Sequence, residues 1–391
     1  MDFSYPPEAE AFRAEFRAWL DANLDDRFRG LDRFVAEGGH SELEKMREWN
    51  RLLADAGYAA IAWPDEYGGR GASVMEQVVW AEEMSRAEAP PTLNPLGIAN
   101  IAPAIMAYGT EDQKLHYLPR MLRGDDIWCQ GFSEPDAGSD LASLKATAVR
   151  ATGAGGDHYV VNGQKVWNTL GHLATHCELL VRTDPSASKH AGISCLVVDM
   201  ASPGVEVRPL VTITGDTEFN EIFFTDVRVP VENLLGPEND GWRVAVTTLT
   251  HERAGVANLH LSVRKKIQRL LDQAREIEVE GRPASQDPVL RQRLAKVYLE
   301  GEYLKLLAYR AVSGMLHGRE TGPESSVAKL VWSDLEQELA EVQGDVFGPD
   351  ANEGDVGRNR LYVRALSIAG GTTQVNKNIV AQRILGLPRG T

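Results

Sequence analysis

Apolar residues recur at three- and four-residue steps along the first third of the chain. Phe12, Phe16 and Leu20 belong to one such series. This period places apolar side chains on one face of an α-helix. The segments that show it are 11–24, 43–53, 74–84 and 97–108. The pattern predicts an all-helical N-terminal domain over residues 1–125.

The pattern changes to short β-type runs between residues 126 and 236. These runs are rich in β-branched and aromatic residues, and turn clusters such as Asn162-Gly163 separate them. They cover residues 146–149, 159–161, 178–182, 193–198, 205–210 and 221–224. Regularly spaced short strands with no helix between them are typical of an antiparallel barrel or sandwich. The predicted central domain, 126–236, is therefore an antiparallel β domain.

Helical periodicity returns after Gly241. The segments 244–277, 287–317 and 325–342 are long enough to be antiparallel members of a helical bundle. A last helix is expected over 372–385. The third predicted domain, 237–391, is a C-terminal helical bundle, and this order of domains places the chain in the α+β class.

Composition limits the partners and the compartment. The formal net charge of −15 argues against a nucleic acid or an anionic membrane as partner, because both require a basic surface. The cysteines at 129, 177 and 195 lack metal-ligand spacing and are interpreted as buried apolar residues in a reducing compartment. Neither a signal peptide nor an apolar run of the ~20 residues that span a bilayer is visible. We expect a soluble, cytoplasmic protein with no metal site and no membrane insertion.

The segment 130–140, QGFSEPDAGSD, is a candidate ligand-binding loop. Its small residues allow the backbone to approach a bulky ligand, and Ser133 and Ser139 supply hydroxyl groups. Successive loop N–H groups can also form an anion-binding concavity. On composition alone, an ordinary turn between a helix and a strand is the simpler interpretation.

Two further segments have residues that suit a planar cofactor. In 163–169, GQKVWNT, Trp167 and Thr169 can present a flat ring and a hydroxyl group, although a tryptophan capping the β-domain core is the simpler interpretation. In 370–374, GGTTQ, a glycine hinge leads into a helix with threonine at its N-cap. A helix N-terminus of this kind also suits the polar half of a cofactor.

Glu252 is the candidate general base. It precedes Arg253 at the start of a long helical segment, and adjacent helical residues point in different directions, so the two are not expected to neutralise each other. The small residues that follow indicate close packing, and desolvation raises the pKa of a carboxylate and makes it a better proton acceptor. The alternative is a surface ion pair.

These segments, in this order and at these separations, resemble the acyl-CoA dehydrogenase family over nearly the whole chain. The matching stretches are 133–140, 165–169, 224–230, 252–253, 370–374 and 379–388. The resemblance implies an N-terminal helical domain, a central antiparallel β-barrel and a C-terminal four-helix bundle. It also implies FAD, held between the β domain and the bundle with a contribution from a neighbouring subunit.

The resemblance further implies roles for individual residues. Residues 130–133 correspond to the wall of the flavin pyrimidine ring, and Trp167 and Thr169 to the redox-active face. Arg275 corresponds to a pyrophosphate contact, and Thr372 and Gln374 to adenine-side contacts. The full set of expected cofactor-binding residues is Gln130, Phe132, Ser133, Gly138, Ser139, Trp167, Thr169, Arg275, Thr372 and Gln374. Ser139 and Arg253 are expected to contact the substrate.

The implied reaction is α,β-dehydrogenation of an acyl-CoA to the trans-2-enoyl-CoA, with proton removal by a glutamate and hydride transfer to flavin N5. Many family members carry this base at the position of Gly370, whereas the isovaleryl and long-chain branches carry it immediately before a helix arginine, as Glu252 does here. The stretch 369–372 is similar to actinobacterial enzymes linked to steroid side-chain degradation. Some of those enzymes are α2β2 heterotetramers.

The expected partners are an acyl-CoA, an electron-transfer flavoprotein or similar acceptor, and further subunits in a homotetramer or an α2β2 heterotetramer. Two alternatives remain open: a non-catalytic FAD- or CoA-binding subunit, and an oxidase-like flavoenzyme. The sequence does not fix the acyl group.

Overall fold

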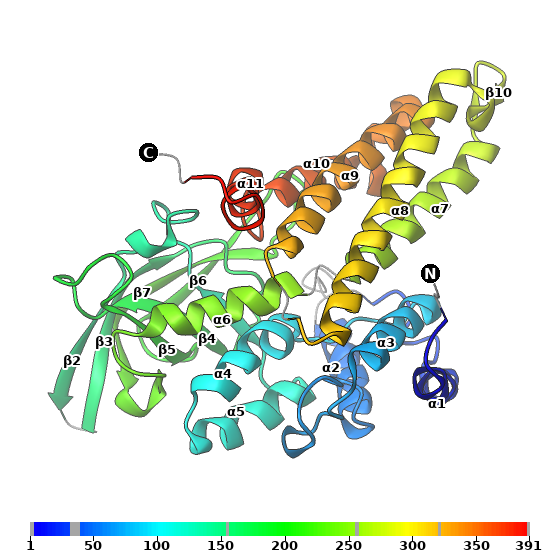
Figure 1. Ribbon diagram of the computed structural model, residues 1–391. Coiled ribbons are helices and arrows are strands. Elements are labelled where there is room, and N and C mark those ends of the chain that lie inside the picture. Colours follow the sequence, from blue (N-terminus) through cyan, green and yellow to red (C-terminus); the bar gives the residue numbers. More distant parts are fainter. Residues whose placement is uncertain (1–3, 32–39, 154–155, 255–257, 320–321, 389–391) are drawn as a thin grey trace. The chain divides into compact units, whose positions relative to one another are not determined.

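The computed structural model describes residues 4–31, 40–153, 156–254, 258–319 and 322–388 (Figure 1). The side chains of residues 40, 41 and 252–254 lie outside this description. Internal contacts divide the chain into two compact units, Met1–Glu252 and Arg253–Thr391. Apolar cores form within each unit.

The first unit begins with helices, as the hydrophobic period predicts. They are α1 (Pro7–Asn23), α2 (His40–Asp55), α3 (Val74–Ala87), a short helical segment Leu96–Ile101 that continues into α4 (Ala102–Tyr108), and α5 (Glu111–Arg123). Phe12, Phe16 and Leu20 are buried on one face of α1. Capping boxes begin α3 and α5, in which Ser73 and Thr110 accept a hydrogen bond from the third helical N–H. The predicted helical segments of this region are confirmed.

A buried carboxylate links α1 to α3. Glu83 is 1% exposed and accepts hydrogen bonds from Arg17 (2.7 and 2.9 Å), Arg86 (2.6 Å) and Arg13 (3.2 Å). Burial favours the protonated form, but the hydrogen bonds from the three guanidinium groups outweigh it and lower the pKa of Glu83 to about 2. Glu83 is therefore ionised at neutral pH and fixes the two helices against each other.

The sheet of the first unit contains β1 (Trp128–Gly131), β2 (Thr147–Gly153), β3 (Gly156–Lys165), β4 (His176–Arg182), β5 (Ile193–Asp199), β6 (Val205–Leu210), β7 (Phe219–Pro230) and β8 (Leu234–Leu235). All six predicted β runs are strands; β1 and β8 were not predicted. The strand order is β6-β7-β3-β2-β4-β5-β8, with β1 added beside β4.

Most neighbouring strands are antiparallel, as expected, but two pairings are not. β1 runs parallel to β4 over four residue pairs, and β2 meets β4 in parallel at one pair. The expectation of a purely antiparallel sheet is therefore wrong. The chain returns to β4 only after the β2–β3 hairpin, which permits a parallel neighbour. Among the described strands the path is open, with β6 and β8 at its ends, so closure into a barrel stays a prediction.

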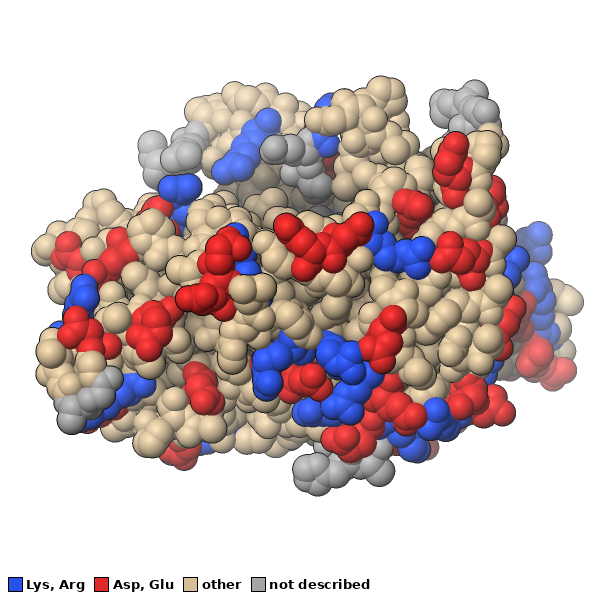
Figure 2. Space-filling view, turned by 90° about the horizontal axis from the view of Figure 1, so that it is seen from below, with Lys and Arg blue, Asp and Glu red and all other residues tan. Residues whose placement is uncertain are grey.

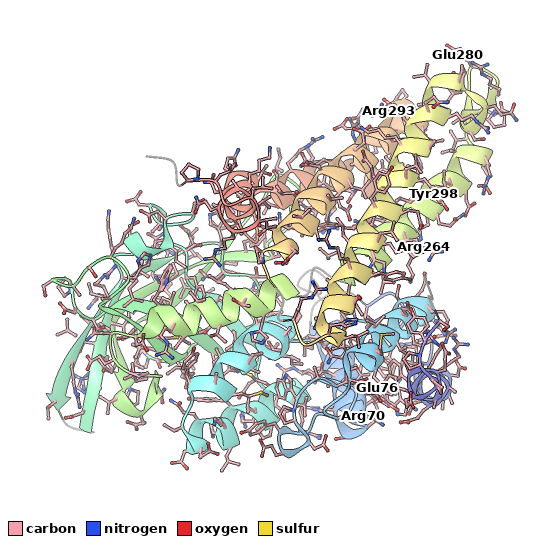
Figure 3. The ribbon with its side chains drawn as sticks, viewed as in Figure 1. Arg70, Glu76, Arg264, Glu280, Arg293 and Tyr298 are labelled. Carbon is pink, nitrogen blue, oxygen red and sulfur yellow. The ribbon has the colours of Figure 1, made fainter. Side chains whose placement is uncertain are left out.

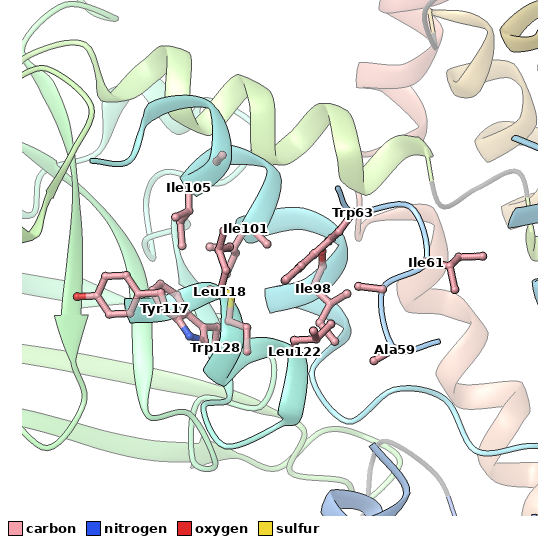
Figure 4. Packing of buried hydrophobic residues seen from close by; sticks show 14 of the residues in the cluster. Ala59, Ile61, Trp63, Ile98, Ile101, Ile105, Tyr117, Leu118, Leu122 and Trp128 are labelled. Carbon is pink, nitrogen blue, oxygen red and sulfur yellow. The ribbon is translucent and has the colours of Figure 1, made fainter. Parts of the chain in front are cut away.

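Helix α6 (Gly241–Ala254) lies along this sheet. Its Val244 and Ala245 are buried in the same core as Trp128 and Cys195. Figure 4 shows Trp128 in this core with residues of α4 and α5, such as Ile105 and Leu118. The opposite face of β4 and β5 contributes to a second core, which these strands form together with β2, β3 and β7. These two strands are therefore covered on both faces.

The second unit is helical. It contains α7 (Leu259–Glu276), α8 (Pro288–Leu316), α9 (Glu324–Phe347), α10 (Gly354–Tyr362) and α11 (Thr373–Ile379). Its core joins residues of the three long helices, for example Ile267, Leu294 and Leu339. Arg293 on α8 donates to Glu338 on α9 at 3.3 Å, and Figure 3 shows Arg293 and Tyr298 along α8.

The segment 244–277 was predicted as one helix. The structure describes α6 over Gly241–Ala254 and α7 over Leu259–Glu276, and residues 255–257 lie outside the described residues. The second unit also contains a short hairpin that was not predicted. Its strands β9 (Glu278–Val279) and β10 (Arg282–Pro283) join α7 to α8, with Glu280 at the turn (Figure 3).

Two features of the described residues bear on partners. None of the described helices is long and apolar enough to cross a bilayer. Within the described ranges, no group of three or more metal-ligating side chains could hold a metal ion. On the face shown in Figure 2, Lys and Arg side chains lie among Asp and Glu side chains.

Candidate active site

A buried ion pair holds two of the predicted ligand-binding segments together. Glu134 of the 130–140 loop accepts a hydrogen bond from Lys165 Nζ at 2.8 Å, and Lys165 also donates to the carbonyl oxygen of Phe132 at 3.0 Å. Lys165 is 0% exposed. Burial lowers the pKa of Lys165, whereas Glu134 raises it. The loop is fixed to the end of β3 by groups of the protein itself.

Backbone hydrogen bonds reinforce this connection. Glu134 accepts from the N–H groups of Lys145 (2.6 Å) and Ala146 (2.9 Å), and the N–H of Val166 donates to the carbonyl of Ser133 at 2.9 Å. The structural roles of Glu134 and Lys165 were not predicted from the sequence. Glu134 lies in the segment 130–140 and Lys165 in the segment 163–169. Their opposite charges were the signal from which an ion pair between the two segments could have been predicted.

Trp167 lies in a turn that presents its ring outward. It is 60% exposed, and its ring meets Phe219 edge-on at 5.8 Å between ring centroids. The interpretation of Trp167 as a cap of the β-domain core is therefore wrong. Trp167 has φ +63° and Leu170 has φ +56°, in the left-handed region that is costly for residues with a side chain. Strained turns of this kind occur preferentially at functional sites.

Buried amides surround this turn. Asn168 is 1% exposed and donates to the carbonyl oxygen of Gln130 at 2.5 Å. The side chain of Asn220 donates to the carbonyl of Asn168 at 2.9 Å and also contacts His172 Nδ1. Burial lowers the pKa of His172, which keeps its ring neutral at physiological pH. The network holds the Trp167 turn and the end of β1 in a fixed relation.

Three buried polar atoms of this network have no hydrogen-bond partner within the described part of the chain. They are the donor Gln130 Nε2, the acceptor Asn168 Oδ1 and the ring nitrogen His172 Nε2. A buried polar group without a partner costs about 1–3 kcal/mol. A donor and an acceptor left free beside an exposed indole ring suit a planar heterocycle whose edge carries both kinds of group. The residues therefore fit a flavin.

The other loop residues differ in their accessibility. Phe132 is buried in the core, so its side chain is not available to a ligand, whereas Ser133 is half-buried. Gly138 and Ser139 are exposed, and a Cβ atom added at Gly138 would meet nothing within 4 Å. Lys189 approaches Asp140 at 2.6 Å and fixes the end of the loop on its exposed side.

The predicted residues of the second unit occupy two separate places. Thr372 is the N-cap of α11 and accepts from the N–H of Val375 at 3.1 Å, and Gln374 is exposed on the first turn. The predicted glycine hinge is confirmed, with φ +65° at Gly370 and +89° at Gly371. The predicted helix 372–385 is confirmed as α11 over Thr373–Ile379, which continues as a π-helical segment over Val380–Ile384.

Arg275 lies in the last turn of α7 and is paired with Asp272 of the same helix at 2.5 Å. The side chain is well exposed. The structure thus gives Arg275 a partner within its own helix and does not bring it together with Thr372 or Gln374.

The predicted base falls outside the described side chains. Glu252 and Arg253 belong to α6, whose backbone is described to Ala254. Their side chains lie outside the described residues. Their roles stay predictions.

Comparison with known proteins identifies the family along nearly the whole chain. Residues 6–125 match the N-terminal domain of acyl-CoA dehydrogenases, 129–227 the middle domain and 239–385 the C-terminal domain. The chain is 40% identical to acyl-CoA dehydrogenase IpdE1 of Mycobacterium tuberculosis over 391 aligned residues, which cover 98% of both chains.

Solved structures agree with this match. A chain of the ChsE4-ChsE5 complex from Mycobacterium tuberculosis superposes with a TM-score of 0.85 at 34% identity, covering 100% of both chains. A chain of the Tcur3481-Tcur3483 steroid ACAD gives a TM-score of 0.85 at 31% identity, again over 100% of both chains. With helical N- and C-terminal regions flanking a sheet, and with a site that fits a flavin, the chain belongs to the acyl-CoA dehydrogenase family of FAD-dependent enzymes.

Proposed function

We propose that this acyl-CoA dehydrogenase uses the carboxylate of Glu252 to remove the α-proton of an acyl-CoA thioester, which leads to the trans-2-enoyl-CoA. Glu252 belongs to α6, one helical turn after the buried Thr248. The segment 367–374 contains no acid, so it offers no competing base. Desolvation near the small residues that follow Arg253 favours proton acceptance at neutral pH.

The FAD cofactor, when bound, supplies the redox chemistry by accepting the β-hydrogen as a hydride. We assign its pyrimidine edge to the amides of Gln130 and Asn168 and the hydroxyl group of Ser133. The observation that carries this assignment is the pair of buried, unpartnered atoms Gln130 Nε2 and Asn168 Oδ1. Trp167 and Thr169 line the redox-active face in this proposal.

The remaining assignments follow the family resemblance. Ser139 and Arg253 contact the CoA thioester, and Thr372 and Gln374 contact the adenine half of FAD. Phe132 and Gly138 contribute backbone to the flavin wall, since the Phe132 side chain is buried. Arg275 binds the pyrophosphate only if its pair with Asp272 opens. The same resemblance supports a closed middle barrel, a four-helix bundle and the domain limits 1–125, 126–236 and 237–391.

We further propose that the acyl group is a steroid-derived, branched or polycyclic one. A solved relative is described as a steroid ACAD, and it covers the whole chain. That relative and the ChsE4-ChsE5 structure are both complexes of two proteins. This supports an α2β2 heterotetramer over a homotetramer. An electron-transfer flavoprotein as the acceptor is proposed from the family resemblance alone.

The second candidate is a non-catalytic FAD- or CoA-binding subunit of such a complex. The two-protein relatives favour it, as does the absence of an acid from 367–374. Anaerobic titration of the purified yellow protein with acyl-CoAs, from short branched thioesters to steroid side-chain thioesters, separates the two. Bleaching of the flavin absorbance by wild type and its loss in Glu252→Gln support the enzyme. Bleaching that persists in Glu252→Gln overturns the base assignment, and no bleaching by any thioester supports the subunit.

A further inference from the structure

The buried acid Glu178 lies outside the site assigned so far. Glu178 is in the middle of β4, and its side chain is 0% exposed. Leu180 of the same strand and Cys195 and Val197 of β5 belong to the core that packs against α6. Side chains alternate along a strand, so Glu178 lies on the Leu180 face. An apolar residue would satisfy this position without the cost of burying a carboxyl group.

Among the described side chains, no cation compensates for this burial. Glu178 Oε1 accepts a hydrogen bond from Thr248 Oγ1 at 2.8 Å, and Oε2 has no hydrogen-bond partner within the described ranges. Burial raises the pKa of Glu178 to about 8, and the hydrogen bond from Thr248 opposes this only in part. Glu178 is therefore a neutral carboxylic acid at physiological pH.

The described titratable groups around Glu178 do not replace a cation. On β5, burial raises the pKa of Cys195, as does the Glu178 charge. Cys177 and Cys129 are equally buried, and they belong to the core on the other face of β4. The buried Lys165 of β3 is paired with Glu134. On α6, His251 is exposed and Arg243 pairs with Asp240.

Glu178 lies beside two elements that carry residues of the proposed site, α6 and β1. Thr248 is 0% exposed and belongs to α6, and residue 252 follows it by one helical turn. On the other side, Glu178 is the register partner of Gln130 in the parallel pair of β1 and β4. Register partners share a face of the sheet, so the unpartnered Gln130 Nε2 and Glu178 Oε2 belong to neighbouring side chains on the same face.

We propose that Glu178 is a positioning residue, which holds α6 against the sheet through Thr248 and thereby fixes the place of residue 252 relative to Gln130. The proposal rests on the proposed role of Glu252 as the base. A single short hydrogen bond in an apolar contact has a strong effect on helix placement, because alternative positions of α6 leave the buried carboxyl group of Glu178 without its partner, whereas Thr248 Oγ1 keeps the carbonyl oxygen of Val244 at 3.4 Å. A displacement of about 1 Å at a base reduces turnover roughly a hundredfold.

Three variants of the FAD-loaded enzyme test this. Glu178→Gln keeps an oxygen that accepts from Thr248 but cannot ionise, Glu178→Leu removes the acceptor, and Thr248→Val removes the donor with little change in shape. Thr247→Val is the matched control, because it makes the same substitution on the neighbouring residue of α6, whose hydroxyl group contacts Tyr108 instead. Hydrogen exchange of the peptide 241–251 reports helix placement, and kcat is measured from pH 6 to 10.

We expect Glu178→Leu and Thr248→Val to raise exchange in 241–251 and to lower kcat roughly ten- to a hundredfold, with KM and FAD content close to those of wild type. Glu178→Gln and Thr247→Val retain wild-type exchange and kcat at pH 7. Wild type loses kcat above about pH 8, and Glu178→Gln does not lose it. A loss confined to kcat, with KM and FAD content unchanged and with rescue in Glu178→Gln, is a result that lower stability alone does not produce.

The proposal is overturned if kcat is unchanged in Glu178→Leu and Thr248→Val, or if wild type and Glu178→Gln share the same alkaline limb. Failure of the proposed function is recognised separately. Full activity of Glu252→Gln shows that Glu252 is not the base. If Glu252→Gln is inactive but the Glu178 variants keep the kcat of wild type, only the positioning role of Glu178 is wrong.

Discussion

The buried carboxyl group of Glu178 makes the stability of the first unit depend on pH in a predictable direction. Its pKa is raised from the ordinary value of 4.5 to about 8 in the folded chain. Between these values the folded chain keeps the proton and the unfolded chain releases it. Stability therefore falls as pH rises through this window, because the unfolded state binds fewer protons.

The magnitude follows from the width of the window, which is about 3.5 pH units. Each pH unit corresponds to about 1.4 kcal/mol, so the loss approaches about 5 kcal/mol above pH 8. Glutamine cannot ionise and still accepts from Thr248, so Glu178→Gln removes the loss. Below pH 4.5, wild type and variant differ little. Above pH 8, the variant is the more stable, with a melting temperature roughly 10 °C higher for a unit of this size.

The assay is thermal unfolding of the FAD-loaded proteins at constant ionic strength between pH 4.5 and 9. Removal of any negative charge relieves repulsion in a chain with a net charge of −15, so a surface variant is needed as control. Glu206→Gln serves this purpose, because Glu206 is exposed and paired only with the neighbouring Arg208. A constant offset between Glu178→Gln and wild type across the pH range would refute the reasoning.

Four further outcomes are expected. Glu252→Gln retains FAD but loses several orders of magnitude in turnover in a dye-coupled assay, since base removal leaves positioning intact. Gly370→Glu in that background restores part of the turnover if the acid reaches the substrate from the C-terminal segment, and unchanged inactivity shows that it does not. Asn168→Ala releases FAD more readily in ultrafiltration than Asn162→Ala, the same substitution at an exposed position outside the site, because it removes a buried acceptor; equal retention would contradict its contact with the flavin. Glu83→Gln lowers the stability of the first unit by about 3 kcal/mol at pH 7, because it leaves a cluster of arginines without its central anion. Since the pKa of Glu83 is lowered, its contribution is present above pH 4.5 and is lost as pH falls toward about 2, so denaturation curves of the two proteins should converge in acid.

The sequence predicts the local elements well and their long-range pairings poorly. The apolar period of α1 and the caps of α3 and α5 depend on residues a few positions apart, and such patterns are visible in one chain. The parallel neighbour of β4 depends on pairing between strands that are far apart in the chain, and such pairing leaves no local pattern.

The candidate site shows the same division. The segments around Ser133 and Trp167 were identified from their composition and from the family resemblance. The Glu134–Lys165 pair was missed because it joins residues 31 positions apart. Glu178 lay inside a predicted strand, where the alternation of side chains gives no reason to single out a carboxyl group.

The pair of Glu134 and Lys165 has a consequence for cofactor loading. Because this pair and the backbone bonds to Glu134 lie entirely within the protein, the apoprotein already holds the 130–140 loop and the Trp167 turn in their final relation. Little ordering entropy is then lost when FAD enters, and preorganised sites bind more tightly for the same contacts. The rate at which FAD reconstitutes the unloaded chain should therefore depend on access to the site, and not on refolding of the 130–140 loop or the Trp167 turn.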